Sequence, residues 1–188
     1  MHNLKPKKYL GQHFLRDMNV ARRIAETLNV PEGATVVEIG PGEGVLTQFL
    51  LDIYGKVEVV EIDVDAVRLL ADTYTPDQVR ITHQDVLKWT PNFSEKIGLI
   101  GNLPYNISSP FFFQVMEYRD QIHEGVFMIQ KEVAERIAAP HGNKTYGILS
   151  VLIKSNFQET YEFSVPPGVF YQPPKVMRRE VTIIQWAA

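Results

Sequence analysis

The stretch 35-TVVEIGPGEGVLT-47 decides the fold of this chain. A β-branched apolar run enters a loop with glycine at every second position, Gly40, Gly42 and Gly44, and a helical pattern follows. In a doubly wound α/β sheet, such a loop lets the backbone approach a ligand where the first strand meets its helix. The loop has neither the G-x-G-x-x-G spacing of a dinucleotide site nor the Lys-Ser/Thr of a nucleoside triphosphate loop. Taken alone, it could also be a plain turn.

Acidic residues follow the next two predicted strands. Glu61 lies near the end of the apolar run 57–62, 21 positions after Gly40, where a doubly wound fold places a carboxylate that binds ribose hydroxyls. Asp85 follows a short strand at 79–82 and can accept a hydrogen bond from an adenine amino group. Either acid alone could be a solvated strand end or a helix cap. Because ligands bind outside the carboxyl ends of the strands, the loop, both acids and Asn102 predict one shared site.

Residues 101–108, Gly-Asn-Leu-Pro-Tyr-Asn-Ile-Ser, carry the strongest functional signal. Asn102 offers an amide oxygen that can accept a hydrogen bond from an amine, Pro104 a rigid turn, and Tyr105 an aromatic face. A pocket that acts on the amino group of a nucleobase needs in-plane acceptors and a ring to stack on, because the base must first leave its own stack. The alternative is a tight turn after a buried strand.

Hydrophobic periodicity predicts strands that alternate with helices, and therefore a largely parallel, doubly wound sheet in one domain. We expect strands near 35–39, 57–62, 79–82, 97–101, 125–130, 157–163 and 181–186. Helical patterns cover 18–28, 44–54, 64–73, 108–118, 132–139 and a turn at 146–152.

Composition limits the class of protein. With 188 residues, 45% of them hydrophobic, the chain suits one globular domain, and no apolar run approaches the roughly 18 residues that span a bilayer. The absence of cysteine excludes disulfides and thiolate zinc sites and fits a reducing compartment. The five histidines lack the spacing of metal ligands, so we expect no bound metal. From the composition as a whole we expect no membrane association and a cytoplasmic location.

The basic residues gather at the two ends of the chain, although the net charge is −3. Residues 1–23 hold six basic side chains against one acidic, and residues 168–188 hold three against one. Phosphate binding depends on local clusters rather than on total charge, so a basic rim is compatible with an RNA partner. Basic ends that only aid solubility are the alternative.

The ordered motifs together resemble a known family. Glu38-Ile-Gly-Pro-Gly-Glu-Gly44, Glu61-Ile-Asp63, Gln84-Asp85 and Asn102-Leu-Pro-Tyr105 are similar to class I S-adenosylmethionine-dependent methyltransferases, and more narrowly to the ribosomal RNA adenine N6,N6-dimethyltransferases. The segments 8-KYLGQHFL-15, 146-YGILS-150, 165-VPPGVF-170 and 173-PPKV-176 resemble that family's other signatures, so the likeness runs from Lys8 to Val176. It implies a Rossmann-like fold whose mostly parallel, seven-stranded sheet has an antiparallel last strand.

The resemblance implies a site and a reaction. The cofactor would be S-adenosyl-L-methionine, with S-adenosyl-L-homocysteine as product, and its contacts would be Gln12, His13, Leu15, Gly40, Gly42, Glu61, Ile62, Asp85, Val86 and Asn102. The Asn102 amide and the Leu103 carbonyl would hold the adenine amino group, beside Pro104. Phe170 would face Tyr105 across the extruded base; a core aromatic pinned by prolines is the alternative.

The resemblance also implies a substrate. We expect dimethylation of two adjacent adenosines near the 3′ end of small-subunit (16S) ribosomal RNA, in an immature small subunit, by a monomer. The alternatives are the large-subunit adenine methylase of the macrolide-resistance type and a non-catalytic RNA-binding or assembly factor. Gln172 and Arg178 depart from the family pattern, which puts loop stiffness and local RNA contacts in question. We expect residues 1–188 to be the catalytic domain without the family's small carboxyl-terminal helical domain. Such a domain should bind the cofactor but have weakened or no activity on the natural substrate.

Overall fold

A computed structural model describes residues 4–171 and, for the backbone alone, residues 179–186. The departures at Gln172 and Arg178 and the segment 173–176 lie outside this range. The strands are β1 Val36–Ile39, β2 Val57–Glu61, β3 Val79–His83, β4 Ile97–Asn102, β5 Ile122–Gln130, β6 Phe157–Val165 and β7 Arg179–Trp186. The α-helices are α1 Met18–Thr27, α2 Val45–Tyr54, α3 Val64–Thr73, α4 Ser108–Glu117, α5 Lys131–Ala138 and α6 Ile148–Asn156. Short 3-10 helices are η1 Lys8–Leu10, η2 Val86–Lys88, η3 Arg119–Gln121 and η4 Pro167–Val169.

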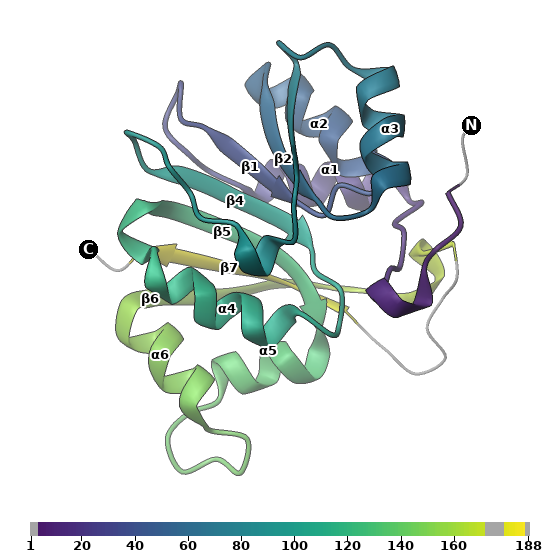
Figure 1. Ribbon diagram of the computed structural model, residues 1–188. Coiled ribbons are helices and arrows are strands. Elements are labelled where there is room, and N and C mark those ends of the chain that lie inside the picture. The colour runs from purple at the N-terminus through teal and green to yellow at the C-terminus, as the bar shows by residue number, and fades with distance from the viewer. Residues whose placement is uncertain (1–3, 172–178, 187–188) are drawn as a thin grey trace.

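The described strands form one sheet in the order β3-β2-β1-β4-β5-β7-β6 (Figure 1). The five strands β1 to β5 are parallel to one another, and β7 runs antiparallel to both β5 and β6. The strand order reverses between β1 and β4, and ligands bind at such a point in open α/β sheets. The expectation of a doubly wound, mostly parallel sheet with an antiparallel last strand is confirmed.

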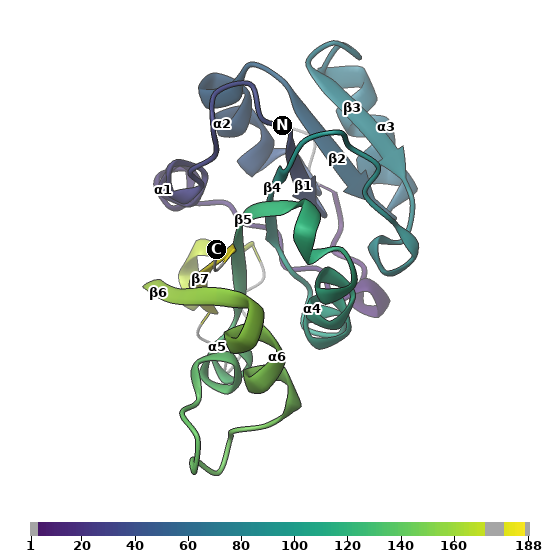
Figure 2. The ribbon, with the colours of Figure 1, turned by 90° about the vertical axis from the view of Figure 1, so that its left-hand side faces the viewer.

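Helices cover the sheet on both faces, and each face has its own hydrophobic core. In Figures 1 and 2, α1, α2 and α3 gather on one side and α4, α5 and α6 on the other. The cores follow from strand alternation: Leu99 of β4 and Phe127 of β5 pack on the α4 side, whereas Ile100 and Val126 pack on the α2 side. Burial on both faces explains why these central strands read as continuous apolar runs.

Gly101 lets β4 come close to β1 at the end of the sheet where the site lies. A Cβ on Gly101 would lie 2.6 Å from the carbonyl oxygen of Ile39, which no other residue type could tolerate. Asn102, the last residue of β4, is thereby brought next to the glycine loop that follows β1.

Several element boundaries differ from the sequence-based expectation: α6 continues to Asn156 instead of ending at 152, β7 begins at Arg179 instead of 181, and β5 and β6 are longer than expected. β5 begins at Ile122 rather than 125, because polar His123 and Glu124 interrupt the apolar pattern although they belong to the strand. Glu124 is buried and its carboxylate accepts the N–H of Asn29 at 2.7 Å, a partner that local periodicity cannot reveal. β6 extends to Val165 rather than 163, since it pairs with β7 as far as that residue.

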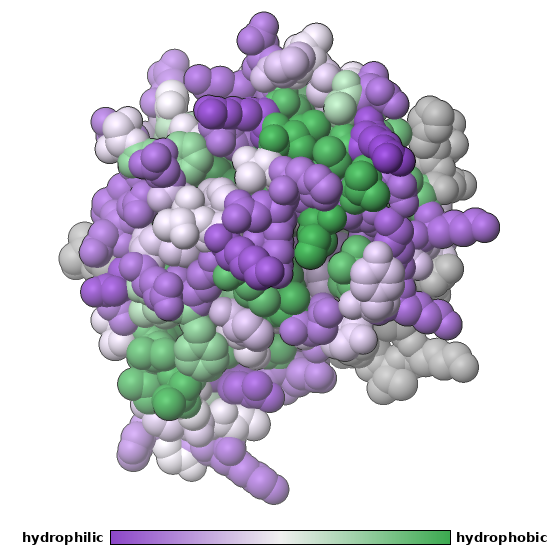
Figure 3. All heavy atoms as spheres, in the orientation of Figure 1, coloured by the Kyte–Doolittle hydropathy of each residue, from purple (hydrophilic) through white to green (hydrophobic). Residues whose placement is uncertain are grey.

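The surface mixes polar and apolar side chains (Figure 3). Hydrophobic residues gather over α6, where Ile148 is 70% exposed and Val151 44%. Within the described residues, no helix is both long enough and apolar enough to cross a bilayer.

Candidate active site

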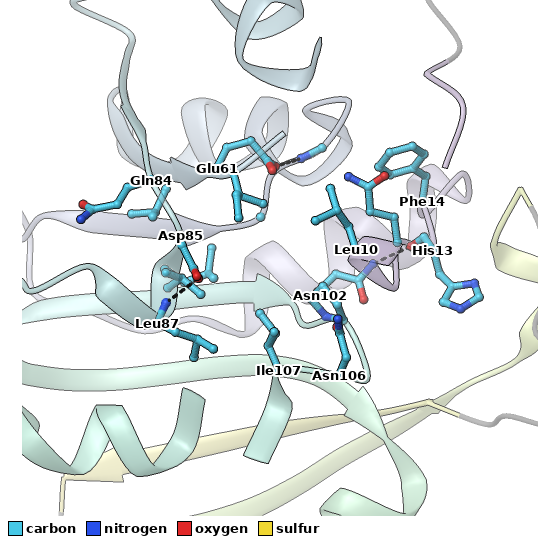
Figure 4. Close-up of a pocket in the computed structure, with 18 residues that line it drawn as sticks. Leu10, His13, Phe14, Glu61, Gln84, Asp85, Leu87, Asn102, Asn106 and Ile107 are labelled. Carbon is cyan, nitrogen blue, oxygen red and sulfur yellow. Dashed lines mark hydrogen bonds between the residues drawn. The ribbon is translucent and has the colours of Figure 1, made fainter. Parts of the chain in front are cut away.

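A cavity of about 240 Å³ opens at the carboxyl ends of β1, β2 and β4 and is roofed by the amino-terminal segment (Figure 4). Every residue predicted to contact a cofactor lines it, except Leu15. Leu15 lies behind it, in the lining of a smaller second cavity. Pro104, predicted as part of the amine-binding turn, and Gln84 of the Gln84-Asp85 motif also line the cavity. The lining residues that sequence reasoning missed are mostly apolar neighbours of the predicted ones: Leu10, Phe14, Ile39, Val60, Leu87, Asn106 and Ile107.

The glycine loop after β1 needs glycine for two different reasons. Gly40, Gly42 and Gly44 all have left-handed backbone angles, with φ of 65°, 55° and 79°. A Cβ on Gly42 would lie 2.8 Å from the Phe14 ring, so this glycine lets the amino-terminal segment pack down on the loop. A Cβ on Gly40 would meet no atom within 4 Å, so it would project into open space beside the cavity. The wall at Gly40 is therefore bare backbone.

Glu61 ties the end of β2 to this loop. Its carboxylate is buried and accepts the N–H groups of Gly42 at 3.1 Å and Asp63 at 2.8 Å. Burial raises the pKa of Glu61, while these two N–H groups oppose the shift. The carboxyl group is thus fixed in direction at the cavity wall, as binding a pair of hydroxyls requires.

Asp85 caps η2 at the far end of the cavity. Its side chain accepts the N–H of Leu87 at 3.0 Å, which fixes the carboxylate (Figure 4). Val86, buried beside it, and half-exposed Ile62 provide apolar surface for a flat ring. Carboxylate, apolar faces and bare backbone together suit an adenine nucleoside.

Asn102 faces the roof of the cavity. Its Nδ2 donates to the carbonyl oxygen of His13 at 2.9 Å, so the amide is oriented and Oδ1 is its acceptor end. Leu103 donates its N–H to the carbonyl oxygen of Met128 at 3.0 Å, and its side chain is buried in the core. The carbonyl oxygen of Pro104 accepts from Ile107 N–H and from Ser108 Oγ, which stiffens the turn. Tyr105 is 48% exposed.

Phe170 does not line the cavity in this structure. Its ring is buried in the α2-side core and lies edge-on to the His13 ring, with centroids 6.5 Å apart. Its backbone forms an antiparallel bridge with Leu15. In this structure Phe170 is therefore packed as a core aromatic, and its role as the second face of a base sandwich with Tyr105 stays a prediction. The sequence pattern singled out Phe170 as a candidate site residue, but it could not predict the direction in which the ring points.

The amino-terminal segment is tied down by contacts that sequence reasoning did not find. Lys7 Nζ lies 2.5 Å from Asp63 and 2.7 Å from Asp65, and Gln12 Nε2 donates to Asp63 at 2.9 Å. Burial alone would raise the pKa of Asp63, but the hydrogen bonds from Lys7 and Gln12 outweigh it and the pKa is lowered. One of the basic residues interpreted as an RNA rim thus pairs within the protein and closes the roof of the site.

Sheet order, glycine loop and strand-end acids define a class I methyltransferase, and solved structures agree. The chain matches a dimethyladenosine transferase from Plasmodium falciparum with a TM-score of 0.80, at 28% identity over 93% of this chain and 63% of that one. It matches the 23S rRNA methyltransferase ErmE with a TM-score of 0.81, at 28% identity over 93% of this chain and 70% of that one.

Sequence comparison gives the family. A family model described as "Ribosomal RNA adenine dimethylase" matches residues 3–184, and the chain belongs to that family. It is 50% identical over 178 residues to a protein of Parabacteroides distasonis named ribosomal RNA small subunit methyltransferase A, which covers 94% of this chain and 67% of the relative. The chain thus spans about two thirds of the length of that relative.

Proposed function

We propose that the cavity binds S-adenosyl-L-methionine. Glu61 would hold the ribose hydroxyls and Asp85 the adenine amino group, with Ile62 and Val86 on the faces of the ring. The bare backbone at Gly40 leaves room that any larger residue would fill. Gln12 and His13 would cover the cofactor from the roof, and Leu15 would support Phe14 from behind. The support is that these groups, from separate strand ends, line one cavity.

We further propose that the chain methylates the N6 amino group of adenosine in RNA, twice. The bound cofactor supplies a methyl group activated by its sulfonium charge. Asn102 Oδ1 and the Leu103 carbonyl oxygen would accept the two N–H bonds of the amine, which favours a pyramidal nitrogen with an available lone pair. As the nitrogen–carbon bond forms and the carbon–sulfur bond breaks, the amine becomes cationic and loses a proton to water. The residues position the amine rather than exchange protons with it.

In this proposal Tyr105 is the main residue that stacks on the base. Its half-exposed ring follows the stiff Pro104 turn, so it can stack on a base at little cost in ordering. Phe170 would join it only after its ring leaves the core, and this leaves Phe170 as the least supported of the proposed site residues.

The proposed substrate is small-subunit ribosomal RNA, at two adjacent adenosines near its 3′ end, within an immature subunit. A relative at 50% identity bears a small-subunit name, whereas the large-subunit enzyme ErmE is 28% identical. A large-subunit target is the second candidate, since ErmE superposes on this chain as well as the dimethyladenosine transferase does. A cytoplasmic, monomeric enzyme is part of the proposal.

The test is methyl transfer from labelled S-adenosylmethionine to unmethylated small and large ribosomal subunits in parallel, followed by mass mapping of the nucleotides. We expect N6,N6-dimethyladenosine in small-subunit RNA and none with the Asn102→Ala variant. Label in large-subunit RNA would favour the second candidate. Saturable cofactor binding without transfer to either subunit would favour a non-catalytic RNA-binding or assembly role.

A further inference from the structure

A second cavity of about 40 Å³ lies behind the glycine loop and shares Phe14, Gly40 and Asn102 with the first. Its lining includes Glu38, an acid in the middle of the apolar strand β1 that is only 2% exposed. We propose that Glu38 helps the site to distinguish the methyl donor, which has a net positive charge, from its product, which has lost the sulfonium charge. Its carboxyl group would release a proton when the donor binds and regain one after methyl transfer. This inference rests on the proposed function, because it presumes the cofactor.

The charges around both cavities have one sign. Among the described residues, the two linings hold four carboxyl groups, Glu38, Glu43, Glu61 and Asp85, and no lysine or arginine. The nearby cation, Lys7, is paired with Asp63 and Asp65 at the rim. A site walled in this way favours a ligand with positive charge.

Glu38 is the most deeply placed of the four carboxyl groups. Its Oε2 accepts the hydroxyl of Thr47, a fully buried residue of α2, at 2.5 Å. The ionisable groups that face it from other elements are Glu61 on β2, Glu43 in the loop and Tyr74 after α3. The amino-terminal segment contributes Phe14 and Leu15 to this cavity, and β4 and β5 contribute Asn102 and Met128. None of these four side chains is charged. Among the residues whose side chains are described, no cation faces Glu38, so a cationic ligand would supply its counter-charge.

The protonation of Glu38 then depends on the ligand. Burial raises the pKa of Glu38, the Thr47 hydroxyl opposes the shift and the charge of Glu61 adds to it, and the resulting pKa is about 8. Near pH 7 the carboxyl is mostly protonated in the protein without ligand. A cation in the adjoining cavity stabilises the carboxylate, so binding expels the proton to solvent. The donor carries a sulfonium and an ammonium against one carboxylate. The product has lost the sulfonium charge, so the proton returns and the product is held less tightly.

Calorimetric titration at pH 7 in two buffers with different ionisation enthalpies counts the protons released. We expect the wild-type chain to release a substantial fraction of one proton with S-adenosylmethionine and clearly less with S-adenosylhomocysteine. Glu38→Gln should abolish that difference and reduce the preference for donor over product by on the order of tenfold. Glu43→Gln is the matched control, since it removes a carboxyl from the same cavity wall and should retain the difference.

The outcomes separate this inference from the proposed function. If neither ligand binds the wild-type chain, the cofactor assignment itself fails. If both bind with equal proton release, or if Glu38→Gln keeps the wild-type preference, the role of Glu38 is overturned and the cofactor site stands. Should Glu38→Gln unfold, as judged by circular dichroism, the wild-type proton counts and Thr47→Val decide. Thr47→Val removes the hydroxyl that stabilises the carboxylate, and should weaken binding of the donor but not of the product.

Discussion

Replacing Gly40 by alanine separates the structural cost of a side chain from its effect on the ligand. Gly40 has φ 65° and an added Cβ would meet no atom within 4 Å, so the folded protein itself has room for the methyl group. The left-handed backbone costs a non-glycine residue about 1–2 kcal/mol. In a domain of this size that lowers the melting temperature by roughly 2–8 °C. The methyl group also projects beside the cavity at the bare-backbone wall.

Gly55→Ala provides the matched control. Gly55, after α2, has φ 76° and likewise no atom within 4 Å of an added Cβ, but it lines no part of the cavity. Differential scanning calorimetry should show similar destabilisation in both variants. Calorimetric titration should show S-adenosylmethionine affinity reduced at least about tenfold, or ~1.4 kcal/mol, by Gly40→Ala alone. Wild-type affinity in a folded Gly40→Ala variant would refute the placement of the ligand against this loop.

Four further outcomes follow from the site. Glu61→Ala should lose more cofactor affinity than Asp85→Ala, because the Glu61 carboxylate also accepts the N–H groups of Gly42 and Asp63. Calorimetric titration of both variants checks this order, and unchanged affinity in both would refute the assignment of the cofactor site. Asp63→Asn should weaken the contacts of Lys7 and Gln12 and so increase the rate of cofactor dissociation several-fold in stopped-flow measurements. Arg68→Ala, a substitution on the neighbouring surface, should leave this rate unchanged. Asn102→Ala should bind cofactor and lose methyl transfer; an active variant would refute its role in holding the amine. Finally, the pKa of Glu38 in the folded protein is about 8, above its ordinary value of 4.5, so the unfolded chain loses this proton at lower pH and the free energy of unfolding should fall as pH rises from about 4.5 to 8. Denaturant titrations across that range should show a smaller dependence of this free energy on pH for Glu38→Gln than for the wild type. The same dependence in both proteins would contradict the argument from burial.

The sequence could predict that the strand-end residues lie close together, because the order of a parallel sheet fixes where the ends of its strands meet. Once 35–47 is assigned as strand, loop and helix, the carboxyl ends of neighbouring parallel strands must meet at one edge. Glu61, Asp85 and Asn102 therefore converge whatever the details of packing.

What the sequence could not predict depends on contacts between distant segments. Lys7 and Asp63 are 56 positions apart, and nothing in either neighbourhood indicates that they pair. The direction of the Phe170 ring depends on how the amino-terminal segment packs, which no local pattern encodes. Glu38 entered the sequence analysis only as the first residue of the glycine-loop motif. Its cavity and its Thr47 partner became apparent only in three dimensions.

A crystal structure of the chain with S-adenosylmethionine bound tests the central claim most directly. The account predicts a donor in the main cavity, with ribose hydroxyls on Glu61, the adenine amino group on Asp85, and the methyl group directed toward Asn102. A donor bound at another surface, or one whose methyl group points away from Asn102, would contradict it.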